Sequence, residues 1–426
     1  MASKLIASTS AAALGLLLTL VTTTAAAASH SSRPTWVASW AASLHAADPD
    51  PREPLLNIGN QTVRERVRLS IGGKQIRVEL SNEYGSTPLI IGSATVALPS
   101  SPASVVPGSL RPLTFDGRNR VTIPAGAPVL SDPVDLPVGP DAEISISLYF
   151  PRHVTMPTLH ALALKRAIVT PPGEFTRADH VETQAISESQ ILLSAVLVPA
   201  RPGQRLVVAF GDSLTDGDGS TVDADRSWPS ALARRLNARA GGPEVAVVNA
   251  GIAGNRLLAD GFGIASLGIS GLARFGRDVL NLPGVTHVVL LEGVNDLGFA
   301  GATLRGQSLA APGEARTTED LIGAYRQLIA SANARGVKVI GATLTPCEGV
   351  DLPGYYTEAK EAARQAINTW IRTSGAFDGV IDFDAVLRDP SHPSRLQARY
   401  ASPDHLHPND AGYQAMADAI DLSLLQ

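Results

Sequence analysis

The sequence predicts a β-rich, sandwich-like or jelly-roll-like region followed by an α/β region with a doubly wound, mainly parallel five-stranded sheet. Residues from about 33 to 200 show short alternating apolar and polar runs, punctuated by Pro and Gly, with no helical pattern of three turns. From residue 203 onward, five short apolar runs alternate with amphipathic helical patterns. We therefore expect domains at 33–200 and 203–426. Functional sites of doubly wound folds lie at the carboxyl ends of the strands.

The first residues have the organisation of a secretory signal peptide. Lys4 precedes an apolar run over 11–21, and residues 22–28 supply small side chains with an Ala-x-Ala type of cleavage site. The apolar run is shorter than the roughly 20 residues that span a bilayer. We expect a signal peptide over 1–28 and a secreted or periplasmic mature protein without a membrane span; the alternative is a buried N-terminal helix.

In the β-rich region, the runs 67–71 and 76–80 alternate apolar and polar residues, and Gly72-Gly73 between them predicts a hairpin turn. Trp36 and Trp40 are candidates for a sugar-binding platform, although such residues also serve in cores. Further strands are expected at 89–98, 121–123, 144–150 and 191–198.

In the α/β region, each predicted strand is followed by a helical pattern. Thr317-Thr318-Glu319-Asp320 is a typical helix start, and Gly336 a typical stop. We expect strands at 205–210, 245–249, 287–291, 337–344 and 379–383, and helices at 228–239, 272–280, 319–334, 358–373 and 410–424. The segment 199–203, with two Pro residues and a Gly, is expected to link the two regions.

The composition of the chain gives no support for nucleic-acid binding and excludes an internal disulfide. The 426 residues are 44% hydrophobic and 18% charged, with a net charge of −5, so nothing favours a nucleic-acid partner. Cys347 is the single cysteine, which excludes an intramolecular disulfide. We expect it to be a loop or partly buried thiol rather than a nucleophile.

Four short motifs follow predicted strands or precede the last helix. They are Gly-Asp-Ser-Leu at 211–214, Asn-Ala-Gly-Ile-Ala-Gly-Asn at 249–255, Gly-Val-Asn-Asp at 293–296 and Asp-His-Leu-His-Pro at 404–408. Each has an ordinary structural interpretation: a serine helix cap, a glycine-rich turn, an Asn-Asp turn or a stiffened loop. Together they supply the groups that ester hydrolysis requires.

The chemical roles follow from the residue types. Ser213 is the candidate nucleophile, His407 the base and Asp404 the carboxylate that orients the base. The backbone amides of Ser213 and Gly251 and the side chain of Asn295 are candidate donors to the oxyanion.

Three other interpretations concern the last motif and the acidic stretch after the first. His405 competes with His407 as base, but we expect it at the surface or directly behind the site residues if Asp404 pairs with His407. A metal site of these three residues with Asp410 lacks a familiar ligand pattern. The acidic stretch 216–225 fails the EF-hand pattern, because Thr221 stands where that loop needs Gly, and we expect a solvated acidic loop.

With these motifs, residues 203–426 resemble the SGNH (GDSL) hydrolase superfamily, whose Ser, Gly, Asn and His match Ser213, Gly251, Asn295 and His407. The resemblance implies a flavodoxin-like α/β/α sandwich and hydrolysis of acyl esters through an acyl-enzyme, with no cofactor or metal. With its β-rich region, the whole chain is similar to a secreted subgroup of arylesterases and acylhydrolases, some associated with plant polysaccharide breakdown. A small-molecule or polysaccharide-linked ester is the expected partner.

Several alternatives remain open at this stage. The same motifs serve thioesterases, lysophospholipases and transacylases. The β-rich region is alternatively a carbohydrate-binding unit with weak hydrolysis attached, or a lid or wall of the cleft. The Gly- and Ala-rich stretch 298–316 is expected to be a surface loop. Acyl chain length, the alcohol and the oligomeric state do not follow from the sequence.

Overall fold

A computed structural model of the chain describes residues 35–48, 56–239 and 245–425. The predicted signal peptide at 1–28 lies outside the described residues. Residues from Thr35 onward form one compact unit. Among the described residues, no helix is both long and apolar enough to cross a membrane.

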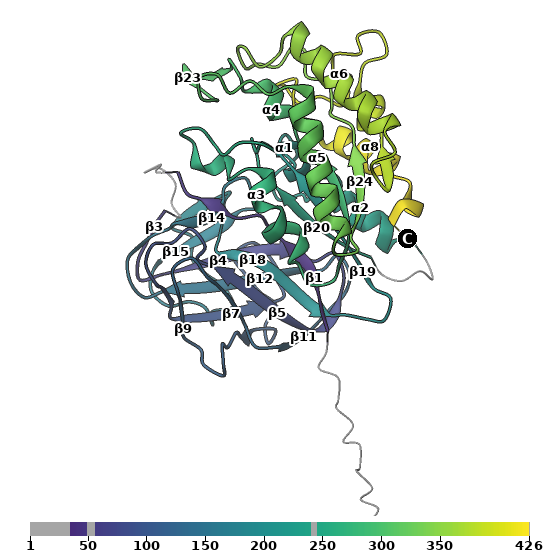
Figure 1. The fold of residues 1–426 in the computed structure, drawn as a ribbon. Helices are drawn as coiled ribbons and strands as arrows, with labels where there is room; N and C mark the ends of the chain where they lie inside the picture. Colours follow the sequence, from purple (N-terminus) through teal and green to yellow (C-terminus); the bar gives the residue numbers. More distant parts are fainter. Residues whose placement is uncertain (1–34, 49–55, 240–244, 426) are drawn as a thin grey trace, which may run out of the picture. The chain divides into compact units, whose positions relative to one another are not determined.

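The C-terminal half contains the predicted five-stranded sheet, and all of its neighbouring strands are parallel. Figure 1 labels β19, β20 and β24 of this sheet among the helices of the same half. The order is β20-β19-β21-β24-β25, which places the first strand of this region, β19, between the second and third. This order is that of a flavodoxin-like doubly wound sheet. The strands are β19 (Arg205–Gly211), β20 (Val245–Gly251), β21 (Val285–Leu291), β24 (Lys338–Ala342) and β25 (Gly379–Ile381).

The helices form two packed groups. α2 packs against α8, which also contacts α7, whereas α5 packs against α3 and α6. The fold prediction for this half is therefore confirmed. The helices are α1 (Ser213–Asp216), α2 (Trp228–Asn237), α3 (Gly271–Phe275), α4 (Val294–Gly298), α5 (Thr318–Asn333), α6 (Glu358–Thr373), α7 (Phe383–Leu387) and α8 (Asp410–Ala419), with a π-helical turn at Gly276–Leu280 and 3-10 turns at Ala265–Leu267 and Leu422–Leu425.

Local signals explain where these helices begin. The side chain of Thr317 accepts a hydrogen bond from the Asp320 amide, and the Asp320 carboxylate accepts one from the Thr317 amide, so α5 starts with a capping box. Thr357 caps α6 through the Lys360 amide. The predicted start at Thr317 is confirmed.

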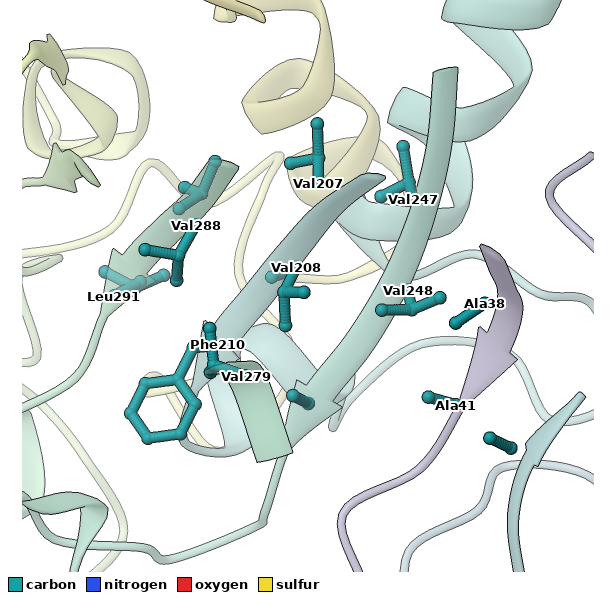
Figure 2. Packing of buried hydrophobic residues seen from close by; sticks show 14 of the residues in the cluster. Ala38, Ala41, Val207, Val208, Phe210, Val247, Val248, Val279, Val288 and Leu291 are labelled. Atoms are coloured by element: carbon teal, nitrogen blue, oxygen red, sulfur yellow. The ribbon is translucent and has the colours of Figure 1, made fainter. Parts of the chain in front are cut away.

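The sheet is buried on both faces, as parallel sheets are. Val207, Val208 and Phe210 of β19 are fully buried, and Figure 2 shows them among side chains of both neighbouring strands. Burial on both faces explains why the sequence of β19 is almost continuously apolar.

The N-terminal half is built from antiparallel sheets, and the largest are a five-stranded and a six-stranded one. The prediction of a β-rich, sandwich-like region is confirmed. The five-stranded sheet contains β1 (Trp36–Ala41), β18 (Leu193–Pro199), β5 (Gly73–Ser81), β10 (Pro128–Leu130) and β11 (Val134–Val138). The six-stranded sheet contains β16 (Ala185–Ser187), β15 (Ala167–Pro172), β4 (Gln61–Arg68), β12 (Glu143–Phe150), β7 (Ser93–Ala97) and β8 (Arg111–Pro112).

Smaller pairings complete this half. They join β13 (Val154–Thr155) to β3 (Asn57–Ile58), β6 (Leu89–Ile91) to β9 (Val121–Ile123), and β14 (Thr158–His160) to both β17 (Gln190–Ile191) and β2 (His45–Ala46).

The predicted hairpin at Gly72-Gly73 is wrong. β4 and β5 belong to different sheets, so the two glycines lie where the chain passes from one sheet to the other. A Cβ on Gly72 would lie 2.4 Å from the Val138 carbonyl oxygen, which explains the need for glycine there. Alternation of apolar and polar residues identifies the buried face of each strand, but it does not say which strand is the partner.

The two halves share a buried boundary. Ala38 and Ala41 of β1 lie beside Val248 of β20 (Figure 2), and the Ala38 amide donates to the Pro283 carbonyl oxygen. Small side chains on β1 permit this close approach.

The acidic stretch 216–225 lies at the same boundary and is not a solvated loop, which corrects the sequence-based expectation. Asp225 contacts Arg68 and Lys165, each at 2.7 Å, and Asp223 contacts Arg66 at 2.7 Å. These cations come from β4 and from the segment before β15, so they are distant in sequence from the loop. They give the acidic residues ion-pair partners in place of solvent.

The stretch 298–316 also has more structure than expected. It contains a short hairpin of β22 (Thr303–Leu304) and β23 (Gln307–Ser308), and Glu314 in it forms an ion pair of 2.9 Å with Arg256. The end of this stretch is connected in this way to the loop that follows β20.

Candidate active site

Ser213 lies immediately beyond the carboxyl end of the central strand β19, at the first position of α1. The turn between them is tight, since a Cβ on Gly211 would lie 2.1 Å from the Leu291 carbonyl oxygen. Asp212 caps the short helix by accepting the Leu214 amide at 3.0 Å. The serine side chain is thereby held at the edge of the sheet where doubly wound folds place their sites.

The structure brings Ser213, His407 and Asp404 together in one hydrogen-bonded chain. The distance from Ser213 Oγ to His407 Nε2 is 2.8 Å, and His407 Nδ1 lies 2.6 Å from Asp404 Oδ2. Since the carboxylate accepts at Nδ1, that nitrogen carries the proton and Nε2 is left to accept from the serine hydroxyl. This is the arrangement of a nucleophile, a base and an orienting carboxylate.

The carboxylate is itself held in place. Asp404 Oδ1 accepts from the Ser402 hydroxyl at 2.6 Å and from the amides of Leu406 and His407 at 2.9 and 3.0 Å. These bonds and the imidazole keep the pKa of Asp404 well below its usual range, although partial burial acts in the opposite direction. Asp404 is therefore ionised across the physiological pH range.

The imidazole is buried and lies among carboxylates. Burial lowers the pKa of His407, but the hydrogen bond to Asp404 and the charges of Asp218 and Asp212 outweigh it and raise the pKa above its ordinary value. Asp218 Oδ2 lies 3.7 Å from Nε2, on the side of the imidazole that faces Ser213. The site therefore stabilises the imidazolium that forms when the base takes a proton.

Two candidate oxyanion donors have geometry consistent with that role. The Ser213 amide is at the first position of α1, where no intrahelical acceptor exists. Asn295 Nδ2 donates to the Asn255 carbonyl oxygen at 2.9 Å, which uses one of its two N–H bonds. The second N–H of Asn295 is left for another acceptor.

The third candidate, Gly251, is already hydrogen-bonded. Its amide donates to Asn249 Oδ1 at 2.9 Å, so a role toward an oxyanion requires a shared or exchanged bond. A Cβ on Gly251 would lie 2.4 Å from the Asp216 amide nitrogen and 3.0 Å from the Asp212 carbonyl oxygen. Glycine is required here because the backbone of α1 passes so close, a reason that the sequence does not reveal.

The three donors lie at or just beyond the carboxyl ends of the adjacent strands β20, β19 and β21. In the register of the sheet, Gly211 of β19 pairs with Gly251 of β20 on one side and with Leu291 of β21 on the other. Ser213, Gly251 and Asn295 therefore all lie at one edge of the sheet, as the sequence predicts.

Residues 209–415 match the GDSL-like Lipase/Acylhydrolase family. This part of the chain belongs to that family. No curated protein matches the chain.

The GDSL-like domain is also similar to solved structures. The lipase/acylhydrolase from Enterococcus faecalis is 21% identical, with a TM-score of 0.37, over 50% of this chain and 92% of that one. An acetyl xylan esterase from Geobacillus stearothermophilus is 19% identical, with a TM-score of 0.38, over 52% and 94%. The M. smegmatis aryl esterase is 15% identical, with a TM-score of 0.38, over 50% and 95%.

Sequence reasoning missed a buried arginine beneath the site of the GDSL-like domain. Arg274 is fully buried, and its guanidinium donates to the carbonyl oxygens of Gly211 and Ala250, both at 2.7 Å. It also donates to Asn255 Oδ1 at 2.7 Å and lies 3.3 Å from the Glu292 carboxylate. One side chain thus connects the ends of β19 and β20 with the segment after β21.

A second missed residue is the aspartate after Asn295. Asp296 accepts the amides of Leu257 and Leu258 at 2.7 and 2.9 Å, and so fixes the loop that begins at Asn255. Burial raises the pKa of Asp296 to about 6, while those two amides lower it. In the sequence, the position of Asp296 in the Gly-x-Asn-Asp motif was the feature that could have indicated its importance.

The competing residues of the last motif lie elsewhere. His405 is exposed, in the left-handed region at φ 61°, while His407 is buried between Ser213 and Asp404. Asp410 accepts from the amide and hydroxyl of Thr221, both at 2.8 Å. The prediction that His405 points to the surface is confirmed.

Cys347 is buried in a loop, and burial raises the pKa of its thiol to about 12. The thiol is therefore protonated and unreactive at neutral pH.

The two candidate platform residues of the β-rich region are partly buried against the core. The guanidinium of Arg77 lies 5.6 Å from the ring centre of Trp36. Trp40 lines a cavity at the boundary with the GDSL-like domain, together with His160 and Asp216.

Proposed function

We propose that the protein is an exported serine esterase that hydrolyses carboxylic esters, with a preference for short acyl groups. The observation that carries the proposal is the hydrogen-bonded chain from Ser213 Oγ through His407 to Asp404, with distances of 2.8 and 2.6 Å. The membership of residues 209–415 in an acylhydrolase family agrees with this chemistry.

The reaction has two halves. In the first, Ser213 Oγ attacks the ester carbonyl carbon while His407 Nε2 takes the hydroxyl proton. The resulting oxyanion accepts hydrogen bonds from the Ser213 amide and Asn295, and from Gly251 if its bond to Asn249 opens. His407 then gives its proton to the departing alcohol, which leaves the acyl group on Ser213.

In the second half, His407 takes a proton from water as the water attacks the acyl-enzyme. Collapse of the second tetrahedral intermediate releases the carboxylic acid and returns the proton to Ser213. No cofactor or metal takes part in this scheme. The substrate is a small-molecule or polysaccharide-linked ester, and export follows from the predicted signal peptide.

The test is the hydrolysis of p-nitrophenyl esters from acetyl to palmitoyl by the wild type and by Ser213→Ala. We expect rates that are highest with acetyl and that fall at least about 10⁴-fold in the variant, since removal of a nucleophile abolishes the acyl-enzyme route. Ser220→Ala, in the same loop region, is the matched control. A maximum with long chains would replace the short-acyl preference by a lipase-type one, and activity retained in Ser213→Ala would refute the proposal.

A further inference from the structure

A buried hydrogen bond joins the β-rich region to the helix that carries the nucleophile. His160, the last residue of β14, places Nε2 3.0 Å from Oδ1 of Asp216, the last residue of α1. The two side chains are 6% and 5% exposed, so the bond is largely shielded from bulk water.

The proton positions of the pair are restricted by its other partners. His160 Nδ1 lies 2.9 Å from the Ser43 carbonyl oxygen, which only accepts, so Nδ1 carries a proton. One further proton then lies between Nε2 and Asp216 Oδ1, on one atom or the other. In both cases the two groups are joined by a hydrogen bond that is lost if either side chain is removed.

Asp216 transmits this contact to the site. α1 has only four residues, too few to be stable as an isolated helix, so its position depends on tertiary contacts. The second oxygen of Asp216 accepts the Ala253 amide at 3.0 Å, in the loop directly after Gly251. Asn249 Nδ2 in turn donates to the carbonyl oxygens of Thr215 and Asp216 at 2.9 and 3.1 Å.

We propose that His160 is a positioning residue, which through Asp216 holds α1 and the Gly251 loop in the arrangement that directs Ser213 Oγ at His407. The β-rich region thus takes part in the esterase reaction and is more than an appended binding unit. This inference rests on the function proposed above, but its test also includes a measurement that does not depend on an ester substrate.

The chain offers a matched control. His45 is a second buried histidine of the β-rich region, with its ring centre 6.1 Å from that of His160. Its Nδ1 lies 2.8 Å from the Ala46 carbonyl oxygen, and its Nε2 accepts the Ala161 amide at 2.9 Å, so both of these partners lie within the β-rich region. Loss of His45 removes the same kind of side chain without removing a bond to α1.

The experiment compares full-length wild type, His160→Leu, His160→Gln and His45→Leu. Active sites are counted with a fluorophosphonate probe that labels Ser213, and kcat, KM and the labelling rate constant are expressed per labelled site. We expect His160→Leu to lower kcat and the labelling rate by between about tenfold and a hundredfold, with KM little changed, because a small displacement of a nucleophile has effects of that size. His160→Gln, which retains a donor for Asp216, should recover most of the rate, and His45→Leu should match the wild type.

The inference would be overturned if His160→Leu and the wild type had equal rates per labelled site. A variant that differed only in having fewer active molecules or a lower melting temperature would show that the role of His160 is purely structural. Equal losses in His160→Gln and His160→Leu would also overturn the inference. If His160→Leu does not fold, the same comparison of His160→Gln with Asp216→Ala decides the question, since only the alanine variant lacks a partner for residue 160 and should lose rate. Absence of Ser213-dependent ester turnover in the wild type would refute the esterase proposal alone, because the labelling rates would still test His160.

Discussion

Tyr355 Oη donates a hydrogen bond of 2.7 Å to Asn295 Oδ1, and both side chains are buried. Burial raises the pKa of Tyr355 well above its ordinary value, so the phenol keeps its proton and remains a donor. Because Oδ1 accepts from Tyr355 and Nδ2 donates to the Asn255 carbonyl oxygen, the amide of Asn295 has one orientation. The direction of the remaining N–H of Asn295 is therefore fixed by Tyr355, which lies outside the four sequence motifs.

Tyr355→Phe should therefore lower kcat without a matching increase in KM. The variant keeps the ring but leaves Asn295 Oδ1 without its donor, and we expect kcat to fall by roughly five- to tenfold, the equivalent of about 1 kcal/mol for one neutral hydrogen bond. Asn295→Ala should lower kcat by about 10²- to 10³-fold, because the oxyanion donor itself is lost. Steady-state kinetics with p-nitrophenyl acetate measures both variants. Equal losses in the two variants would mean that Tyr355 does more than orient the amide.

The charge of Asp218 should set the acid limb of the pH profile. His407 must be neutral to accept the Ser213 proton, and the carboxylates of Asp218, Asp404 and Asp212 raise its pKa against the effect of burial. Asp218→Asn removes one negative charge 3.7 Å from Nε2, which lowers the pKa of His407 and moves the acid limb of kcat/KM to lower pH. The plateau at higher pH should change little.

The measurement is kcat/KM from about pH 4 to pH 9, a range that brackets the ordinary imidazole pKa. Asp421→Asn, at an exposed aspartate near the C-terminus, is the control and should leave the profile unchanged. A shift of the Asp218→Asn limb toward higher pH would contradict the assignment of His407 as the base.

The motifs of the site were predictable from the sequence because three of them lie at the ends of strands of the parallel sheet and the fourth precedes the last helix. The order of the motifs and the parallel sheet were enough to place Ser213, Asn295 and His407 at one edge. The residues that hold them were not, since His160 and Asp216 are 56 positions apart and Ser43 and Arg274 are 231 positions apart. Such contacts depend on how the β-rich region packs against the α/β region, and local patterns carry no information about that packing.

β4 shows the same limit within a single strand. Arg64 and Arg66 lie on one face of this strand, and both are buried although their side chains are charged. Arg64 donates to the carbonyl oxygens of Ala103 and Ala178 at 3.0 and 2.8 Å, and Arg66 contacts Asp223. Loops from distant parts of the chain cover the polar face of the strand, so polar residues there did not mean exposure.

Glu65, on the opposite face of β4, should make the protein less stable as the pH rises. It is fully buried, and burial raises the pKa of its carboxyl from 4.5 to about 8, although the Ile191 amide lowers it. Between these two pKa values, the folded state keeps the proton that the unfolded state releases. The contribution of Glu65 to the free energy of unfolding is therefore complete below about pH 4.5 and is lost progressively up to about pH 8.

Glu65→Gln should remove this dependence, because the amide is neutral at every pH and its oxygen still accepts the Ile191 amide. We expect the variant to exceed the wild type in melting temperature by more at pH 8 than at pH 5, as measured by differential scanning calorimetry in each buffer. Glu182→Gln, at an exposed glutamate, is the control. A difference between Glu65→Gln and wild type that is independent of pH would show that Glu65 is ionised in the folded protein.

Arg274 should be important for both stability and turnover. Its guanidinium lies 3.3 Å from the buried Glu292 and 3.2 Å from Asp278, and it donates to the carbonyl oxygens of Gly211 and Ala250. Burial and the nearby Asp212 raise the pKa of Glu292 well above its ordinary value, whereas Arg274 lowers it. Arg274→Met keeps much of the length but leaves Glu292 buried without its cation. Removal of one partner from a buried ion pair costs about 3–5 kcal/mol, and protonation of Glu292 offsets part of this cost, so we expect the free energy of unfolding to fall by no more than that amount.

Urea denaturation measures the loss, and Arg326→Met, at an exposed arginine of α5, is the control. Arg274→Met, Glu292→Gln is the decisive companion, because it removes the unpaired carboxylate and should recover part of the stability. The double variant should still have reduced kcat, since the backbone carbonyls next to Ser213 and Gly251 remain without their donor. Full recovery of kcat together with stability would mean that Arg274 acts only by neutralising Glu292 and not by aligning the strand ends.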